Sequence, residues 1–133
     1  LVAGLTALGW EVEDVTAYRT VRAAPPHVDT REAIKGGGFD AVVFTSSSTV
    51  RNLVGIAGKP HAASVIACIG PATAKTAQEH GLRVDVLPEE PTMLALAQAL
   101  AAHGVALRET AAQAGAVGWR PSRKRSGARR RAT

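Results

Sequence analysis

One pattern constrains the fold of this chain more than any other: a short strand-like run, a turn, and then a segment with apolar residues at helical spacing. The pattern occurs three times, and its runs lie at 41–44, 65–69 and 83–87. The first two runs are unbroken apolar stretches, which are typical of strands buried on both faces. Strands that alternate with helices favour right-handed crossovers and a parallel sheet. The sequence therefore predicts an α/β fold in which helices flank a parallel sheet.

Each predicted helix has its own signals. Pro91 or Thr92 is expected to open the helix after the third run. Ahead of the first run, Asp29 or Thr30 is expected to cap a short helix that glycines 36–38 end. The residues expected to face the core from the three later helices are Val50, Leu53, Val54, Ala57, Ala74, Ala77, Leu94, Ala97, Leu100 and Ala101.

The N-terminal part differs from this pattern. Residues 1–8 have helical spacing and precede Gly9, which predicts the end of a helix. Residues 10–21 alternate in polarity and are rich in Val and Thr, which predicts an exposed strand. Tyr18, on this strand, either packs its ring on the domain or supplies a phenol that donates a proton to a leaving group. Because the chain begins at Leu1 and its one methionine is internal, we expect a preceding segment to be missing.

The basic charge of the chain is concentrated at its C-terminus. Seven of the 16 Lys and Arg residues lie in the last fourteen positions, and no acid lies beyond Glu109. Residues 1–119 therefore carry nine bases against 11 acids, a net charge of −2. With few apolar groups to offset the entropy of ordering, residues 109–133 are expected to form a disordered basic tail. Nucleic acid is not an expected partner of the fold, although the tail could give weak, salt-sensitive binding.

Two loops follow the first two predicted strands and lead directly into helices. They are Thr45-Ser46-Ser47-Ser48-Thr49 and Gly70-Pro71-Ala72-Thr73. Ligands of open parallel sheets bind at the carboxyl ends of the strands, and the free N–H groups of helix N-termini attract anions. Helix capping by Ser and Thr explains one such loop equally well. Two such loops on neighbouring strands favour a site for an anionic substrate.

Other chemical motifs are absent from the sequence. It contains no Gly-x-Gly-x-x-Gly, no Walker loop and no Gly-x-Ser-x-Gly nucleophile elbow. The four histidines are scattered, so we expect no metal site. Cys68 is expected to be a small buried residue of a strand. No apolar stretch approaches the ~20 residues that cross a bilayer, so a membrane is not an expected partner and the chain is expected to be cytoplasmic.

Four segments together resemble the uroporphyrinogen-III synthase family. They are Val15–Thr20, Val43–Val50, Ala67–Ala74 and Gly81–Val84, and they follow the family's order and spacing over about residues 1–104. The family has Ser-Pro-Ser where this chain has Ser46-Ser47-Ser48, so the loop lacks a proline but keeps its hydroxyls. The basic end is also similar to that of family members in which this domain follows a uroporphyrinogen-III C-methyltransferase.

The resemblance implies an activity. The family cyclises hydroxymethylbilane, inverts ring D through a spiro intermediate and releases water, without a cofactor or a metal. The carboxylates of this substrate suit the anion-receiving loops. Tyr18 stands where the family has a tyrosine proposed to assist departure of the hydroxyl, so it is the predicted catalytic residue. The predicted substrate-binding residues are Thr45, Ser46, Ser47, Ser48, Gly70, Ala72 and Thr73.

The resemblance also implies a domain organisation. The family fold has two α/β domains, one inserted into the other, with the active site between them. Residues 1–9 would end the inserted domain, 10–28 form a connector strand and linker, 29–108 complete the first domain, and 109–133 form the tail. If the complete sheet is flavodoxin-like, the first predicted strand lacks its central neighbour, and the chain needs the missing N-terminal part of the protein to be active. The alternative is a non-catalytic α/β module that binds a phosphorylated or carboxylated metabolite.

Overall fold

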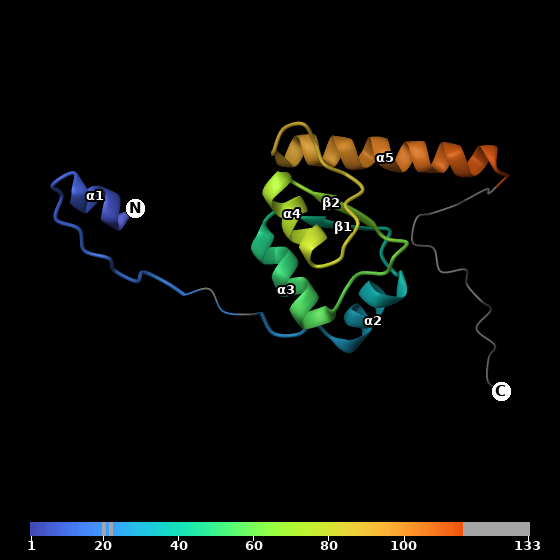
Figure 1. The fold of residues 1–133 in the computed structure, drawn as a ribbon. Coiled ribbons are helices and arrows are strands. Elements are labelled where there is room, and N and C mark those ends of the chain that lie inside the picture. Colours follow the sequence, from blue (N-terminus) through green and yellow to red (C-terminus); the bar gives the residue numbers. More distant parts are fainter. Residues whose placement is uncertain (20, 22, 116–133) are drawn as a thin grey trace.

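The fold is given by a computed structural model that describes residues 1–19, 21 and 23–115 (Figure 1). Two parallel strands form its sheet, β1 (Ala41–Phe44) and β2 (Val65–Cys68), in a register that places Ala41 opposite Val65. Both strands fall on the predicted apolar runs. The α/β fold with a parallel sheet is therefore confirmed within the described residues.

The third predicted strand, at 83–87, is wrong as a strand. Only Val86 pairs, through a single parallel bridge to Ala67 on the side of β2 away from β1. The Asp85 side chain accepts the Ile66 N–H through Oδ2 at 2.8 Å, so a carboxylate takes the place of a strand carbonyl and shortens the ladder. The order β1, β2, Val86 is nevertheless that of the last three strands of a flavodoxin-like sheet.

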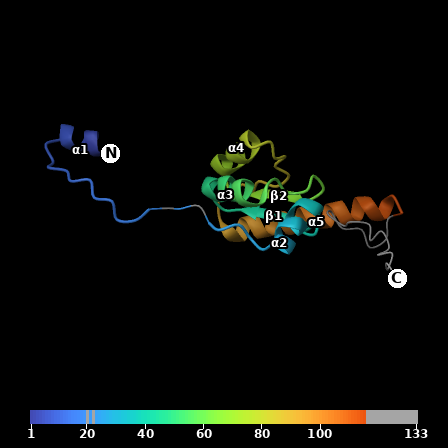
Figure 2. The same cartoon turned by 90° about the horizontal axis from the view of Figure 1, so that it is seen from below.

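Helices cover both faces of the sheet (Figure 2). α3 (Ser47–Ala57) and α4 (Pro71–Glu79) lie on one face, α5 (Met93–Gln113) lies on the other, and α2 (Val28–Gly36) contacts α3. Side chains of β2 alternate between the two faces. The core beneath α3 and α4 consists of Phe44, Val50, Ile66, Cys68, Ala74, Ala77 and Leu82. The core beneath α5 consists of Val65, Ala67, Val86 and Leu96.

The predicted cap residues agree with the structure at Gly37 and Thr92 but not at the start of α2. Gly37 ends α2 in the left-handed region, at a φ of 78°, as the glycine run predicted. The predicted N-cap of α2 at Asp29 or Thr30 is wrong, because Nδ1 of His27 accepts the Asp29 N–H at 3.3 Å and the helix begins earlier. Thr92 caps α5 as predicted, through a hydroxyl that accepts the Ala95 N–H at 3.1 Å.

α5 is longer than predicted and presents a different face to the sheet. Residues 109–113 of the expected disordered tail are helical, and residues 116–133 of that tail lie outside the described residues. Leu100 packs against the core as predicted, but Leu94, Ala97 and Ala101 are exposed, and Leu96 is the buried residue instead. An Ala- and Leu-rich helix has no clear polar side, so apolar spacing alone could not define its rotation about its axis.

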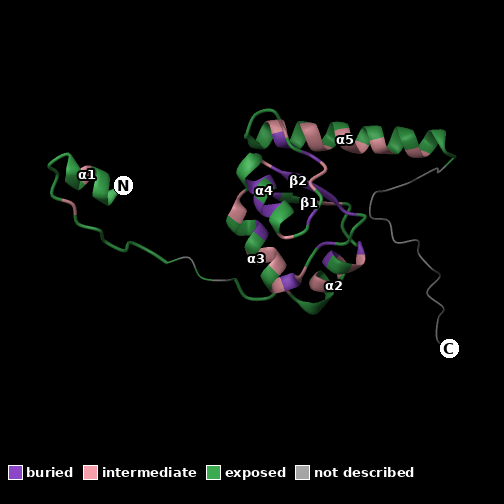
Figure 3. Ribbon diagram, viewed as in Figure 1, coloured by how far each residue is buried: buried purple, intermediate pink, exposed green. Residues whose placement is uncertain are grey.

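The N-terminal arm extends away from the body (Figure 1). α1 (Val2–Ala7) confirms the predicted helix, whereas the strand predicted at 10–21 is wrong in its described residues, which carry no strand. A strand needs a partner for its backbone groups, and neither view places another segment beside this arm. Figure 3 shows the arm almost entirely exposed. Its exposed large apolar side chains are Leu1, Val2, Leu8, Trp10, Val15, Tyr18 and Val21.

Candidate functional site

The two loops predicted to bind an anion lie side by side at the carboxyl edge of the sheet. β1 and β2 are parallel neighbours, and the Ile69 N–H donates to the Phe44 carbonyl at 3.0 Å where the strands end. The Ser47 hydroxyl donates to the Ala72 carbonyl in the other loop at 3.2 Å. α3 and α4 start from these loops and pack against each other. The structure therefore brings residues 45–49 and 70–73 together at one edge of the sheet.

Hydroxyls of the first loop cap α3. The Ser46 hydroxyl accepts the Thr49 N–H at 3.3 Å, and the Thr49 hydroxyl accepts the Ser46 N–H at 3.3 Å, which together form a capping box. The Ser48 hydroxyl lies 3.0 Å from that of Ser46. Capping is therefore confirmed for Ser46, and its partner Thr49 was not among the predicted site residues. Thr45 is exposed, and its hydroxyl bonds no other described residue.

Ser47 ties the loops together, and Ser47→Ala is expected to lower the free energy of unfolding by about 0.5–1.5 kcal/mol. The substitution removes the hydrogen bond to Ala72, the one side-chain hydrogen bond that links the two loops among the described residues. Urea unfolding of the chain measures the loss. Ser48→Ala is the matched control, because the Ser48 hydroxyl contacts only its own loop. A larger loss in the control than in Ser47→Ala would contradict the role given to Ser47.

Thr73 is the loop residue whose hydroxyl stays available although the residue is buried. It is 5% exposed, and its hydroxyl forms no hydrogen bond with another described residue. Every fully buried side-chain oxygen of the described residues has a hydrogen-bond partner. Because the Thr73 hydroxyl has none, its oxygen is not fully buried and can be reached from the surface. Thr73 lies in the first turn of α4, where Gly70 is the N-cap and Pro71 is the first residue. Backbone N–H groups of such a turn have no partner in the helix and attract anions.

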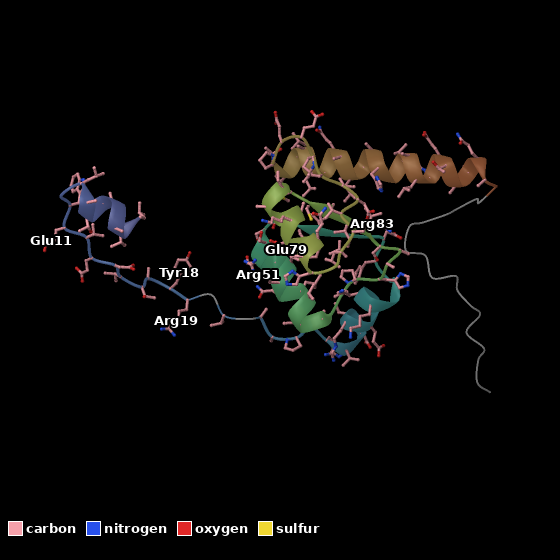
Figure 4. The ribbon with its side chains drawn as sticks, viewed as in Figure 1. Glu11, Tyr18, Arg19, Arg51, Glu79 and Arg83 are labelled. Atoms are coloured by element: carbon pink, nitrogen blue, oxygen red, sulfur yellow. The ribbon has the colours of Figure 1, made fainter. Side chains whose placement is uncertain are left out.

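Tyr18 is not brought to the loops. Figure 4 shows Tyr18 beside Arg19 on the extended arm, away from the body. Its side chain is 84% exposed, so the ring is not packed on the domain either. The sequence placed Tyr18 and the loops in one candidate site, but this chain alone does not assemble it.

Two cations stand near the starts of α3 and α4. Arg51, labelled in Figure 4, is four residues beyond Ser47, and Lys75 is four residues beyond Pro71. Both side chains are exposed, and neither forms an ion pair within the described residues, where the ion pairs are His27–Asp29 and Arg83–Asp85. Neither was among the predicted site residues. The signal that could have found them is the spacing of four, which places them one helical turn beyond the loops.

Cys68, at the end of β2, is not an available nucleophile. Cys68 is fully buried, as predicted, and burial raises the pKa of its thiol, which keeps it protonated and unreactive. Within residues 1–19, 21 and 23–115, no three His, Cys, Asp or Glu side chains are grouped so as to hold a metal ion. No described helix is long and apolar enough to cross a membrane.

The fold defines a class of protein, a parallel α/β domain, and its strand-end loops carry hydroxyls and helix N-termini with two cations nearby. The family model of uroporphyrinogen-III synthase HemD matches residues 1–98. The chain belongs to the uroporphyrinogen-III synthase family, which confirms the resemblance of the four sequence segments.

One curated relative and the solved structures complete the comparison. A Methanothermobacter thermautotrophicus protein, provisionally named as a uroporphyrinogen-III synthase, is 46% identical over 66 residues. That match covers 47% of this chain and 26% of the relative, so the chain spans about a quarter of the relative's length. No solved structure matches the chain.

Proposed function

We propose that this chain forms one wall of the active site of a uroporphyrinogen-III synthase, a lyase. In the complete protein, hydroxymethylbilane is cyclised with inversion of ring D through a spiro intermediate, and its hydroxyl group leaves as water. No cofactor takes part. The observation that carries the proposal is Thr73, a buried residue at the start of α4 whose accessible hydroxyl has no internal partner, in a chain of this family.

The two loops are proposed to bind the carboxylates of the substrate. The Thr73 hydroxyl and the free N–H groups of the first turn of α4 donate hydrogen bonds, which are strongest to a charged acceptor. Thr45, exposed beside them, adds a hydroxyl. Arg51 and Lys75 supply positive charge within reach of the longer carboxylate chains. Ser47 acts indirectly, because its hydroxyl holds the two loops at a set distance.

Tyr18 is proposed to be the catalytic residue, whose phenol donates a hydrogen bond to the departing hydroxyl. This role requires the N-terminal arm to pack against a segment outside the chain. Two observations support such packing: α1 buries none of its residues, and the arm exposes a row of large apolar side chains. The absent segment would bury them, complete the second α/β domain and bring the phenol over the loops.

The protein is proposed to work in tetrapyrrole biosynthesis, which supplies haem, sirohaem and cobalamin, and to do so in the cytoplasm. A uroporphyrinogen-III C-methyltransferase is proposed to precede it in the same polypeptide. That arrangement would place the consumer of uroporphyrinogen III next to its producer.

Tyr18→Phe in the complete gene product is expected to lower kcat for the formation of type III uroporphyrinogen by about a hundredfold, because general acid assistance to the departing hydroxyl is lost. KM is expected to change little, because the ring is kept. The measurement is the rate of formation of the type III isomer, separated by chromatography from the type I isomer that forms spontaneously.

The same experiment tests the competing function, an α/β module that binds an anionic metabolite without catalysis. The position of Tyr18, remote from the loops in this chain, favours that alternative. A module would form no type III isomer at all and would bind its ligand equally well with phenylalanine at this position. An unchanged kcat in an active protein would remove Tyr18 from the mechanism.

A further inference from the structure

A second candidate site lies at the end of the sheet opposite the loops. It is a cavity of about 230 Å³, lined by the turn between α3 and β2 and by the turn that follows α4. These turns precede β2 and Val86, so they lie at the amino ends of the strands. We propose that this cavity binds a small molecule that carries a carboxylate or phosphate on an apolar group. This site is independent of the proposed synthase site.

The charge of the lining favours an anion. Three of the lining residues are basic, Lys59, His61 and Arg83, and none is acidic. Lys59 forms no ion pair within the described residues. Its ammonium lies over Gly81, where an added Cβ would come within 2.6 Å of Nζ. Gly81, at a φ of 75°, therefore leaves room for an unpaired cation beside the cavity.

The other two basic side chains are held in place by their neighbours. Nδ1 of His61 accepts the Ala63 N–H at 3.0 Å, so Nε2 carries the proton of the neutral ring and is a donor. Nε of Arg83 donates to Asp85, and another guanidinium nitrogen lies 3.5 Å from the Ala62 carbonyl. Asp85 balances the charge of Arg83, so Lys59 supplies the uncompensated positive charge, and the other two supply oriented donors.

The floor of the cavity is apolar. Pro60, Ile66 and Leu82 line it and are buried, and the Ser64 hydroxyl is already engaged with the Phe39 carbonyl at 2.8 Å. An anionic head at the basic rim would thus leave an apolar body on the floor, where burial of apolar surface adds affinity. A bare inorganic ion would leave this floor uncovered.

Amide chemical-shift titrations of the ¹⁵N-labelled chain at constant ionic strength test the proposal. The probes are inorganic phosphate, acetate, phenyl phosphate and benzoate. We expect shifts in residues 58–64 and 81–84, with tighter binding of the two aromatic anions than of their inorganic or aliphatic counterparts. Comparison of phenyl phosphate with benzoate then shows whether the site prefers a phosphate or a carboxylate. Shifts at residues 45–49 and 70–73 report binding at the proposed synthase site separately. A lack of binding at one of the two sites therefore does not affect the test of the other.

Lys59→Gln is expected to weaken binding at the cavity by about tenfold, the lower end of the range for loss of a hydrogen bond to a charged group, because the Lys59 side chain is exposed. Arg108→Gln is the matched control, because it also removes one positive charge but lies in α5, outside the cavity lining. Equal affinity in Lys59→Gln and the unchanged chain would overturn the proposal. So would an absence of shifts in both turns, or equal affinity for phosphate and phenyl phosphate.

Discussion

Thr73→Val in the complete gene product is expected to lower kcat/KM for hydroxymethylbilane by about tenfold to a hundredfold, with no loss of stability. The interaction that would be lost is the proposed hydrogen bond to a substrate carboxylate, worth about 1.5–3 kcal/mol, and each 1.4 kcal/mol is about a factor of ten. Valine has nearly the same shape, and the Thr73 hydroxyl bonds no other described residue, so no internal hydrogen bond is lost. Kinetics of type III formation and urea unfolding measure the two quantities.

Thr76→Val is the matched control for this prediction. Thr76 is also buried and lies three residues further along α4, but its hydroxyl donates to the Ala72 carbonyl at 3.1 Å. Its replacement removes an internal hydrogen bond and no proposed substrate contact, so a small loss of stability and little change in kcat/KM are expected. The opposite pattern, with activity lost only in Thr76→Val, would place the substrate elsewhere.

The chain alone is expected to form no type III uroporphyrinogen above the spontaneous type I product. Tyr18, the proposed catalytic residue, is exposed on an arm away from the loops, so the reacting groups are not assembled. Loss of positioning is among the largest effects in catalysis, since oriented groups contribute roughly 7–11 kcal/mol. The match to the curated relative covers only 26% of that protein, which leaves most of such a protein outside this chain.

The test compares the chain with the complete gene product at equal concentration, with hydroxymethylbilane as substrate.

The free edge of β1 is the part of the sheet that the additional segment would cover. Within the described residues β1 pairs on one side only, with β2, and its Val43 is 42% exposed. Unpaired apolar edges promote association between chains, so the chain is assayed in its monomeric fraction. Type III product from that fraction would show that one wall of the site suffices.

Much of the fold was predictable because its signals are local. The apolar runs predicted β1 and β2, and the hydroxyl-rich loop at 45–49, Gly70-Pro71 and Thr92 marked the starts of α3, α4 and α5, each over a few residues. The errors occurred where a distant partner decides. The pairing at 83–87 is shortened by the Asp85 carboxylate, and the strand expected at 10–21 has no partner in the described residues.

The sequence predicted where the candidate site lies, but not which role each of its residues has. Both loops are at the predicted edge, and seven loop residues were named for binding. Sequence could not separate Ser46, which caps α3, from Ser47, which bonds the other loop, or either from Thr73, whose hydroxyl stays unpaired. Three adjacent serines have the same chemistry, and only their directions in space distinguish them.

The sequence by itself determined the parallel strand and helix units, the hydroxyl-rich loops at their junctions and the resemblance to the synthase family. These depend on composition and on spacing within a few residues. The tertiary structure alone decided that Ser47 meets Ala72, 25 residues away, that Thr73 is buried without a partner, and that Tyr18 stays apart from both. Such outcomes depend on which distant groups come into contact, and for the arm that carries Tyr18 no described segment supplies the contact.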